Sequence, residues 1–378
     1  MTPATEPLLA RTPLLASGHQ DPLRASGEPV RWGVVSTGRI ASTVTSDLAL
    51  LPDAVLHAVS SRSRAGAEEF AARHGFRHAY GDDGGLPGYV RLIQDPDVDI
   101  VYVATPHASH FTVAKAALEA GKHVLCEKPM TLNARDAAVL AGLARRKGLF
   151  LMEAVWSRFL PSVQRAAEII ASGELGEIRS IQADLGFPAP RHPETRLWQR
   201  AAGGGALMDV GVYPLTWALI ALGAPQSLTA AAHITGDGVD AETAVTLSYP
   251  SGARAQFMVS LTTVSAQAAT VSGTKGLMRC NAPLFNPTEL ALTFGSGETR
   301  LETFVPAGHG YTYQLREVLR CLQLGLTESP TMPLADTLMV MSLLDEARRQ
   351  AGITCPSDSS EATNRLTAEA GGSLCRED

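Results

Sequence analysis

Two side chains that can bind a polar ligand or move a proton stand close together between residues 202 and 214. Three consecutive glycines, Gly203 to Gly205, precede them, and glycine lets a backbone approach a ligand closely. Asp209 and Tyr213 follow four residues apart, which places them on one face of a helix that begins here. The glycines favour a binding site built around this carboxylate and phenol, although Asp209 could instead cap the helix and Tyr213 could pack in the core.

Further polar residues follow two apolar runs earlier in the chain. Thr105, His107 and His110 come after one run, and Glu127 and Lys128 end the next. If both runs are parallel strands, these residues meet at the carboxyl edge of the sheet, where ligands bind in open α/β folds. Each residue also has an ordinary reading, since a lysine before a proline often enters a surface turn and a histidine can cap a helix. Two such loops beside one crevice indicate a nucleotide site.

A turn suited to a phosphate follows the first apolar run. Ser36 stands at the first glycine position of the dinucleotide-binding fingerprint, Gly38 keeps the second and Ala41 takes the third. A tight turn here aims backbone N–H groups and the positive end of the next helix at a pyrophosphate. The alternative is a plain strand-to-helix turn. We expect nucleotide contacts from Ser36, Thr37, Gly38, Arg39 and Ile40.

The end of the second apolar run bears on which dinucleotide binds. Enzymes that use NAD usually place an acid there to hold the ribose 2'-hydroxyl, whereas this chain has Ser61 and Arg62, followed by Arg64. A guanidinium flanked by hydroxyls suits a 2'-phosphate. We therefore expect NADP rather than NAD, with Ser61 and Arg62 as contacts. If both arginines are merely solvated, the missing acid still weakens the case for NAD.

The fold class is predicted to be α/β, with two domains. From residue 30 to 153, runs that are apolar on both faces alternate with helical patterns, which indicates βαβ units and a doubly wound Rossmann domain. From 154 to 353 the pattern predicts an α+β domain for substrate binding and dimerisation. Its sheet is largely antiparallel and open, with a second subunit as the natural cover. Residues 1–29 are expected to be a disordered leader and residues 354–378 a polar tail.

Composition excludes several function classes. Acidic residues outnumber basic ones, 38 to 32, for a net charge of -6, so nucleic-acid binding is not expected. No uninterrupted apolar stretch approaches about 18 residues, so no membrane association is expected. The five cysteines are scattered without a C-x-x-C pair, which argues against a disulfide framework or a metal site and for a reducing, cytoplasmic compartment.

Several of these segments together resemble those of a known family, the Gfo/Idh/MocA oxidoreductases. The resemblance rests on Glu127-Lys128-Pro129 and on the Gly-Gly-Gly-x-x-x-Asp-x-Gly-x-Tyr segment. Within the family the chain looks most like the dimeric dihydrodiol dehydrogenases, also described as NADP-dependent D-xylose 1-dehydrogenases. The resembling stretches span the folded part and include Arg31 to Gly33, Leu151 to Phe159, Val271 to Gly276, Asn286 to Leu290 and Glu328 to Pro330.

The resemblance implies roles for particular residues. The family's catalytic lysine falls on Lys128, its catalytic tyrosine or histidine on Tyr213 and its acid on Asp209. The pocket tryptophan of the dihydrodiol enzymes falls on Trp156. A phenylalanine of those enzymes is Leu185 here, which puts specificity for aromatic diols in doubt. The resemblance also implies a homodimer formed through the open sheets.

The implied reaction is reversible hydride transfer between a nicotinamide and a carbon that bears a hydroxyl or carbonyl group. We hypothesise that Tyr213 is the general acid or base, that Lys128 favours its phenolate and anchors the substrate oxygen, and that Asp209 orients the lysine or a substrate hydroxyl. The roles of Asp209 and Tyr213 could be exchanged. Substrate contacts are expected from Trp156, Arg158 and Phe159, with Trp198 and Arg196 as further candidates.

The sequence therefore favours an NADP-dependent oxidoreductase that acts on a sugar, a sugar derivative or a cyclic diol as its small-molecule substrate. A ketoreductase for a nucleotide-linked sugar and a non-catalytic dinucleotide sensor are the alternatives. The presence of Lys128, Asp209 and Tyr213 together speaks against the sensor.

Overall fold

The first domain is built on a six-stranded, all-parallel sheet with the order β3-β2-β1-β4-β5-β6. This computed structural model describes residues 21–192 and 195–355. The strand order is that of a doubly wound Rossmann sheet, with its switch point between β1 and β4. The strands are β1 (Val30–Val35), β2 (Ala54–Ser60), β3 (His78–Tyr80), β4 (Ile100–Val103), β5 (His123–Glu127) and β6 (Leu151–Ala154), and the helices are α2 (Arg39–Leu48), α3 (Arg64–His74), α4 (Gly88–Gln94), α5 (His107–Glu119) and α6 (Ala134–Lys147).

The sheet confirms the predicted alternation of strands and helices. Its strands are apolar in sequence because they are buried on both faces. Every residue of β4 and of β6 is buried, and Trp32 of β1 is fully inaccessible. The short strand β3 and the helix α4 are not identified by the sequence analysis. The turns that follow β1, β4 and β5 lie at one edge of the sheet, which brings Ser36, Thr105 and Lys128 to the same side.

The second domain contains an eight-stranded sheet with the order β14-β13-β12-β11-β7-β10-β9-β8. β9 and β10 form an antiparallel hairpin, in which Phe257 faces Val245. The largely antiparallel sheet is therefore confirmed, with one parallel pair, β7 and β10, at its centre. The edge strands β8 and β14 are not identified by the sequence analysis. The strands are β7 (Ile178–Gly186), β8 (Ser227–Ile234), β9 (Asp240–Ser248), β10 (Arg254–Ser260), β11 (Ala269–Gly273), β12 (Gly276–Cys280), β13 (Glu289–Phe294) and β14 (Thr299–Thr303).

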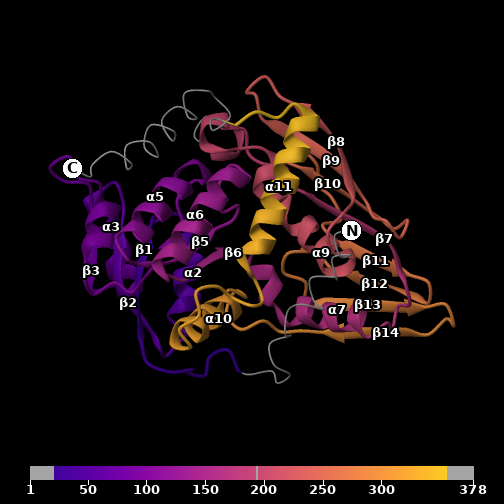
Figure 1. Cartoon of the computed structure of the whole chain (residues 1–378), viewed down its shortest axis with the longest axis horizontal. Helices are drawn as coiled ribbons and strands as arrows, with labels where there is room; N and C mark the ends of the chain where they lie inside the picture. Colours follow the sequence, from indigo (N-terminus) through magenta and orange to yellow (C-terminus); the bar gives the residue numbers. More distant parts are fainter. Residues whose placement is uncertain (1–20, 193–194, 356–378) are drawn as a thin grey trace, which may run out of the picture.

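Helices cover one face of this larger sheet and leave the other open. Along β10, Phe257 and Val259 are buried while Gln256 and Met258 are exposed. Figure 1 shows α11 lying between the two sheets, where it contacts β8 on one side and α6 on the other. The helices of this part of the chain are α7 (Pro161–Ala171), α8 (Ala206–Val210), α9 (Val212–Leu222), α10 (Thr312–Gln323) and α11 (Leu334–Ala351).

The segment from residue 21 to 29 is bound to the rest of the protein. Arg316 of α10 donates to the Pro22 carbonyl at 2.8 Å and to the Asp53 carboxylate at 2.6 Å, and the Ser26 amide also donates to Asp53, at 2.9 Å. The expectation of a disordered leader therefore fails for these residues, because hydrogen bonds to Arg316 and Asp53 hold them. The rest of the leader and nearly all of the predicted tail lie outside the described residues.

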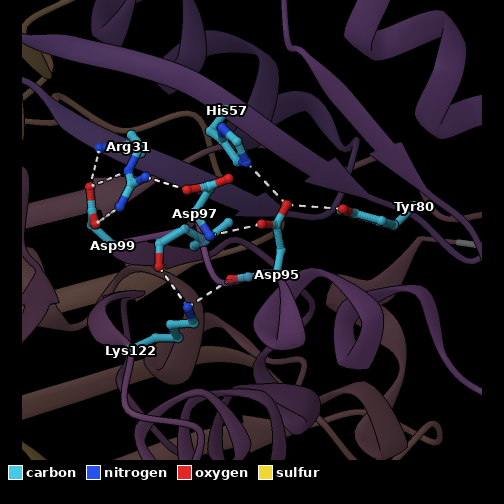
Figure 2. A network of polar contacts seen from close by, with 8 residues as sticks. Arg31, His57, Tyr80, Asp95, Asp97, Asp99 and Lys122 are labelled. Carbon is cyan, nitrogen blue, oxygen red and sulfur yellow. Dashed lines mark hydrogen bonds and ion pairs between the residues drawn. The ribbon is translucent and has the colours of Figure 1, made fainter.

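A polar network joins the elements at the amino edge of the parallel sheet (Figure 2). Arg31 donates to both carboxylate oxygens of Asp99, at 3.1 and 2.8 Å. The Asp95 carboxylate is bound by the ring of His57 at 3.0 Å and by the hydroxyl of Tyr80 at 2.9 Å. These bonds connect β1, β2, β3 and the start of β4.

Three members of this network, His57, Asp95 and Asp97, bring possible ligand atoms within 4.8 Å of one another. The carboxylate of Asp97 is bound by Arg31 at 2.5 Å, and Lys122 donates to the carbonyl of Asp95 at 2.7 Å. Because Arg31 pairs with Asp97 and protein groups already bind the Asp95 carboxylate, we interpret this cluster as a structural network rather than a metal site.

One helical stretch has the dimensions of a membrane span. The 23 residues of Arg200–Leu222 include a window of mean hydropathy 1.5, but 94% of that window is buried inside the protein. A helix that is apolar all round also occurs in the core of a large domain. Here α9 packs against β7 and β11, so the stretch forms part of the core of the second domain.

Candidate active site

Lys128 follows directly after β5 and reaches the second domain. Its Nζ lies 5.2 Å from the centroid of the Tyr213 ring and 4.0 Å from Oδ1 of Asp209. It also donates a hydrogen bond to the main-chain carbonyl of Asp209. Asp209 lies in α8 and Tyr213 in α9. The structure thus brings the three residues that are expected to be catalytic together where the two domains meet.

Two cationic side chains, Lys128 and Arg196, lie beside the Asp209 carboxylate. Arg196 donates to its Oδ1 at 2.7 Å, and Nε2 of His107 lies 3.9 Å from the same oxygen. Burial alone would raise the pKa of Asp209, but Lys128 and Arg196 outweigh it and lower the pKa to about 2. Asp209 is therefore ionised near neutrality and a weak proton acceptor. Asp209 could orient Lys128 or exchange roles with Tyr213 as the general acid or base. The low pKa and these contacts agree better with an orienting role.

Tyr213 is a neutral phenol in this site. Nε1 of Trp156 donates to its hydroxyl oxygen at 3.1 Å, which leaves the phenolic hydrogen available to a substrate oxygen. Burial and the charge of Glu127 raise the pKa of Tyr213 well above its ordinary value. The structure does not support the expectation that Lys128 favours the phenolate. The ammonium stands over the ring, and no described hydrogen bond joins it to the phenol oxygen.

Two aromatic residues that the sequence analysis missed complete the surroundings of Tyr213. The Tyr311 ring stacks on Trp156 with centroids 4.2 Å apart, and Phe285 lies 5.1 Å from the Tyr213 ring. Aromatic faces of this kind form the walls of many small-molecule pockets. Neither Phe285 nor Tyr311 stands in a motif that indicates chemistry, so only tertiary contacts reveal them. We call the four residues the aromatic group: Trp156, Tyr213, Phe285 and Tyr311.

Two histidines brace the loops after β4 and β5. The ring nitrogens of His110 lie 2.8 Å from the carbonyls of Thr105 and of Pro129. Burial lowers the pKa of His110 to about 4 despite the opposing effect of these carbonyls, so the neutral ring donates to only one of them. Nδ1 of His107 lies 3.0 Å from the Gly203 carbonyl, and burial keeps the pKa of His107 well below its ordinary value.

Glu127 stabilises the loop after β5 through side-chain hydrogen bonds. The Tyr102 hydroxyl donates to its Oε1 at 2.7 Å, and the Lys128 amide donates to Oε2 at 3.2 Å. Burial raises the pKa of Glu127. These contacts hold the backbone of Lys128 in place, while nucleotide contacts from Glu127, Thr105 and the two histidines stay predictions.

The glycines before Asp209 serve the packing of the protein itself. A Cβ on Gly203 would meet Leu132 at 2.5 Å, and a Cβ on Gly205 would meet Oδ1 of Asp240 at 2.1 Å. Their φ angles are 72° and 109°, in the region that favours glycine. The sequence analysis interpreted this run as room for a ligand. The structure corrects that interpretation, because the close neighbours are protein atoms.

Two of the expected substrate contacts are engaged elsewhere. The Arg158 guanidinium pairs with Asp336 at 2.8 Å and contacts the sulfur of Met332 at 3.0 Å, and Phe159 is 1% exposed. The structure therefore does not support substrate contacts for Arg158 and Phe159, since both groups are buried against the protein. The Arg196 side chain is 41% exposed and stays a candidate.

The turn after β1 can receive an anion. Ser36 has a φ of 117°, where glycine is favoured, and its hydroxyl accepts the Gly38 amide at 3.1 Å. The helix α2 begins at Arg39 without a side-chain cap and without an acid in its first turn. Its first N–H groups and the positive end of its dipole are therefore left for a bound group.

Arg62 is the second residue after β2, next to Ser61. It is exposed, and its guanidinium forms no hydrogen bond or ion pair with the residues that the structure describes. Arg64 differs, because its guanidinium pairs with Glu68 at 2.8 Å. The Thr37 hydroxyl lies 3.4 Å from that of Ser61, so both hydroxyls are close to this turn. Arg62 is thus available to bind an anion.

Two family descriptions match the chain. "Oxidoreductase family, NAD-binding Rossmann fold" matches residues 30–155, and "GFO/IDH/MocA C-terminal domain" matches residues 163–279. The chain belongs to the Gfo/Idh/MocA oxidoreductase family. The resemblance read from the sequence is thereby confirmed, and the protein is an oxidoreductase with an NAD(P)-binding Rossmann domain.

Members of this family with known names share most of the chain. The trans-1,2-dihydrobenzene-1,2-diol dehydrogenase of Bos taurus is 36% identical over 342 residues, which cover 87% of this chain and 99% of that protein. A 3-ketoreductase from Actinomadura kijaniata, solved with NADP and TDP-benzene, has a TM-score of 0.77 at 30% identity. An aldose-aldose oxidoreductase from Caulobacter crescentus, solved with glycerol, has a TM-score of 0.77 at 26% identity. Each structural match covers 86% of this chain and 98% of the other.

Proposed function

We propose that this protein is an NADP-dependent oxidoreductase that transfers a hydride between the nicotinamide and a hydroxyl or carbonyl carbon of a sugar, a sugar derivative or a cyclic diol. The meeting of Lys128 and Tyr213, 5.2 Å from Nζ to ring centroid, carries the proposal. A positive charge and a proton-bearing phenol at one point are what the reduction of a carbonyl group needs. The diol and aldose enzymes among the relatives support the substrate class.

The described residues fit a dinucleotide with a 2'-phosphate. The uncapped start of α2 suits a pyrophosphate, and the unpaired guanidinium of Arg62 suits the additional phosphate. NAD fits less well, because no acid stands at the end of β2. When bound, NADP would supply the hydride chemistry. The residues that would hold it are Ser36, Thr37, Gly38, Arg39, Ile40, Ser61 and Arg62.

The side chains of this protein would hold and deliver one proton. Trp156 fixes the phenol oxygen of Tyr213, whose own hydrogen can pass to a carbonyl oxygen. Lys128, which is oriented by the main-chain carbonyl of Asp209, would stabilise the negative charge that develops on that oxygen. Because the phenol is neutral, the site is ready to act as a general acid. In the direction of oxidation the phenol must first lose its proton.

A nucleotide-linked sugar is the second candidate substrate. The match to the 3-ketoreductase solved with TDP-benzene favours it, since that enzyme shares the fold over 86% of this chain. A non-catalytic dinucleotide sensor is less well supported, because a sensor has no need for Lys128, Asp209 and Tyr213 to meet.

We also propose a cytoplasmic homodimer that forms through the open face of the larger sheet. Met258 and Leu277 lie on this face and are 40% and 37% exposed. An open sheet face with apolar side chains is suited to a second copy of the chain. The compartment is supported by three buried cysteines with free thiols, Cys126, Cys280 and Cys321.

A substrate panel tests the proposal. Free aldoses, cyclic diols, keto-sugars and nucleotide-linked keto-sugars are offered with NADPH or NADP, beside NADH or NAD, and the nicotinamide absorbance is followed. We expect turnover of at least one of these substrate classes, and a preference for NADPH or NADP over NADH or NAD. Tight NADPH binding without turnover of any substrate would favour the sensor and contradict the enzyme. Size-exclusion chromatography with light scattering measures whether the protein is a dimer.

A further inference from the structure

The loop that leads into α10 is held by a buried acid of the first domain. Asp47 lies in the last turn of α2, and its side chain is 1% exposed. Its Oδ2 accepts the Tyr311 amide at 2.8 Å, and its Oδ1 accepts the His309 amide at 2.9 Å. Nδ1 of His309 lies 2.8 Å from the same Oδ1. An acid at the carboxyl end of a helix faces the negative end of the helix dipole, so Asp47 depends on these donors.

Two glycines let this loop fit between α2 and the aromatic group. Gly308 and Gly310 have φ angles of 58° and 99°. A Cβ on Gly308 would lie 2.4 Å from Oδ1 of Asp47, and a Cβ on Gly310 would lie 2.9 Å from the Trp156 ring. The loop therefore touches the acid on one side and the candidate active site on the other.

The residue that the loop presents is Tyr311. Its ring stacks on Trp156 at 4.2 Å, and Trp156 in turn donates to the Tyr213 hydroxyl at 3.1 Å. Burial, with Tyr213 and Glu127 as further causes, raises the pKa of Tyr311, so it is a neutral ring that packs rather than a charged group. A continuous set of contacts thus runs from Asp47 to the phenol of Tyr213.

We propose that Asp47 is a positioning residue of the active site. By binding the amides of His309 and Tyr311, it sets the Tyr311 ring against Trp156 and so fixes the phenol of Tyr213. Asp47 touches none of the groups proposed to react and acts through Tyr311. Because α2 also begins at the nucleotide turn, one helix serves both the nucleotide side and the substrate wall of the site. The kinetic part of this inference rests on the proposed function.

The variant that tests it is Asp47→Asn. Asparagine keeps the shape but replaces one acceptor oxygen by an amide donor, so one loop amide loses its partner. We expect kcat/KM to fall roughly 10- to 100-fold, mainly through a higher KM for the carbonyl or hydroxyl substrate, with NADPH affinity unchanged. Amide hydrogen exchange of residues 307–313 should become faster.

Asp53→Asn is the matched control. Asp53 is also buried, 2% exposed, and it also binds α10, through Arg316 at 2.6 Å. None of its hydrogen-bond partners, Arg316, Ser26 and Gln323, belongs to the aromatic group. We expect Asp53→Asn to lower the melting temperature without changing KM or the exchange of residues 307–313. Equal effects of both variants on KM would reduce Asp47 to a purely structural role and overturn the inference.

Tyr311→Leu provides the second test. It should raise KM by itself, and in this background Asp47→Asn should raise KM no further, because the acid acts through the ring. Fully additive effects would contradict the inference, and so would a Tyr311→Leu variant with normal KM, even if Asp47→Asn does not fold. If the wild-type protein turns over no substrate, the proposed function fails. Amide hydrogen exchange of residues 307–313 then tests the positioning role of Asp47 without kinetics. Unchanged exchange in Asp47→Asn would overturn that role.

Discussion

The ammonium of Lys128 lies over the ring of Tyr213, 5.2 Å from its centroid, although the two residues come from different domains. Lys128 directly follows a strand of the parallel sheet, and Tyr213 lies in the first turn of α9. A strand end and a helix start therefore place the two side chains where the domains meet. The Glu-Lys-Pro motif and the glycine-rich motif, each ambiguous alone, thus contribute to a single site.

Replacing Lys128 by methionine should lower kcat strongly. The change removes the positive charge next to the developing oxyanion, and we expect a loss of about 10²- to 10³-fold in the rate of carbonyl reduction. Steady-state kinetics with the best substrate of the panel measure it. Lys115→Met, on the surface beside Glu119, is the control and should leave kcat unchanged. A Lys128→Met enzyme within a few-fold of wild type would remove the lysine from the mechanism.

Replacing Arg62 by alanine should weaken NADPH binding and leave NADH binding nearly unchanged. A charge-assisted contact to a 2'-phosphate is lost, which corresponds to roughly a 10- to 100-fold change in Kd. Fluorescence titration with each cofactor measures the difference. Arg64→Ala is the matched control, because its guanidinium is already paired with Glu68. Equal losses for both cofactors in Arg62→Ala would argue against a 2'-phosphate site.

Glu153 should make stability depend on pH. This residue of β6 is fully buried, its Oε1 accepts the Met130 amide at 3.0 Å, and burial raises its pKa to about 7. A carboxyl with a raised folded pKa stabilises the fold fully below its ordinary pKa of 4.5 and loses that contribution as pH rises through about 7. The loss is on the order of 3 kcal/mol by mildly alkaline pH.

Glu153→Gln keeps the acceptor for Met130 but cannot ionise. Its free energy of unfolding in urea should therefore fall less between about pH 5 and about pH 8 than that of wild type. Asp240, whose pKa burial raises to about 6, keeps its own smaller contribution in both proteins. Identical slopes in the variant and the wild type would show that Glu153 does not titrate in this range.

Gly205→Ala should destabilise the second domain. The added Cβ would lie 2.1 Å from Oδ1 of Asp240, and alanine disfavours the φ of 109°. We expect a loss of at least ~2 kcal/mol in the free energy of unfolding. Gly236→Ala, where a Cβ would meet nothing within 4 Å, is the control. If the two variants are equally stable, the glycine run does not have the packing role that the structure assigns to it.

The parallel sheet could be predicted from sequence because its strands are buried on both faces and alternate with helices. Where this signal is weak, elements were missed. β3 has only three residues, and β8, with the sequence SLTAAAHI, is an edge strand rich in alanine. The leader from residue 21 onward looked disordered because its partner, Arg316, stands almost three hundred positions away. Contacts of this kind leave no local pattern.

The active site shows the same limit. Lys128, Asp209 and Tyr213 stand in recognisable motifs, and the structure brings them together. Tyr311 and Phe285 could not be found, because their places beside Trp156 and Tyr213 depend on how distant segments pack. The charge of Asp209 and the neutrality of the Tyr213 phenol were equally out of reach, since the first depends on cations from other segments, which outweigh burial, and the second on burial.

The most direct test of the account is the rate of carbonyl reduction by Tyr213→Phe, with NADPH affinity and melting temperature measured on the same protein. The change removes only the hydroxyl that is proposed to donate the proton. We predict that kcat falls about 10²- to 10⁴-fold while NADPH binding and stability stay close to those of wild type. A Tyr213→Phe enzyme that keeps a near-normal kcat would contradict the assignment of Tyr213 as the proton donor.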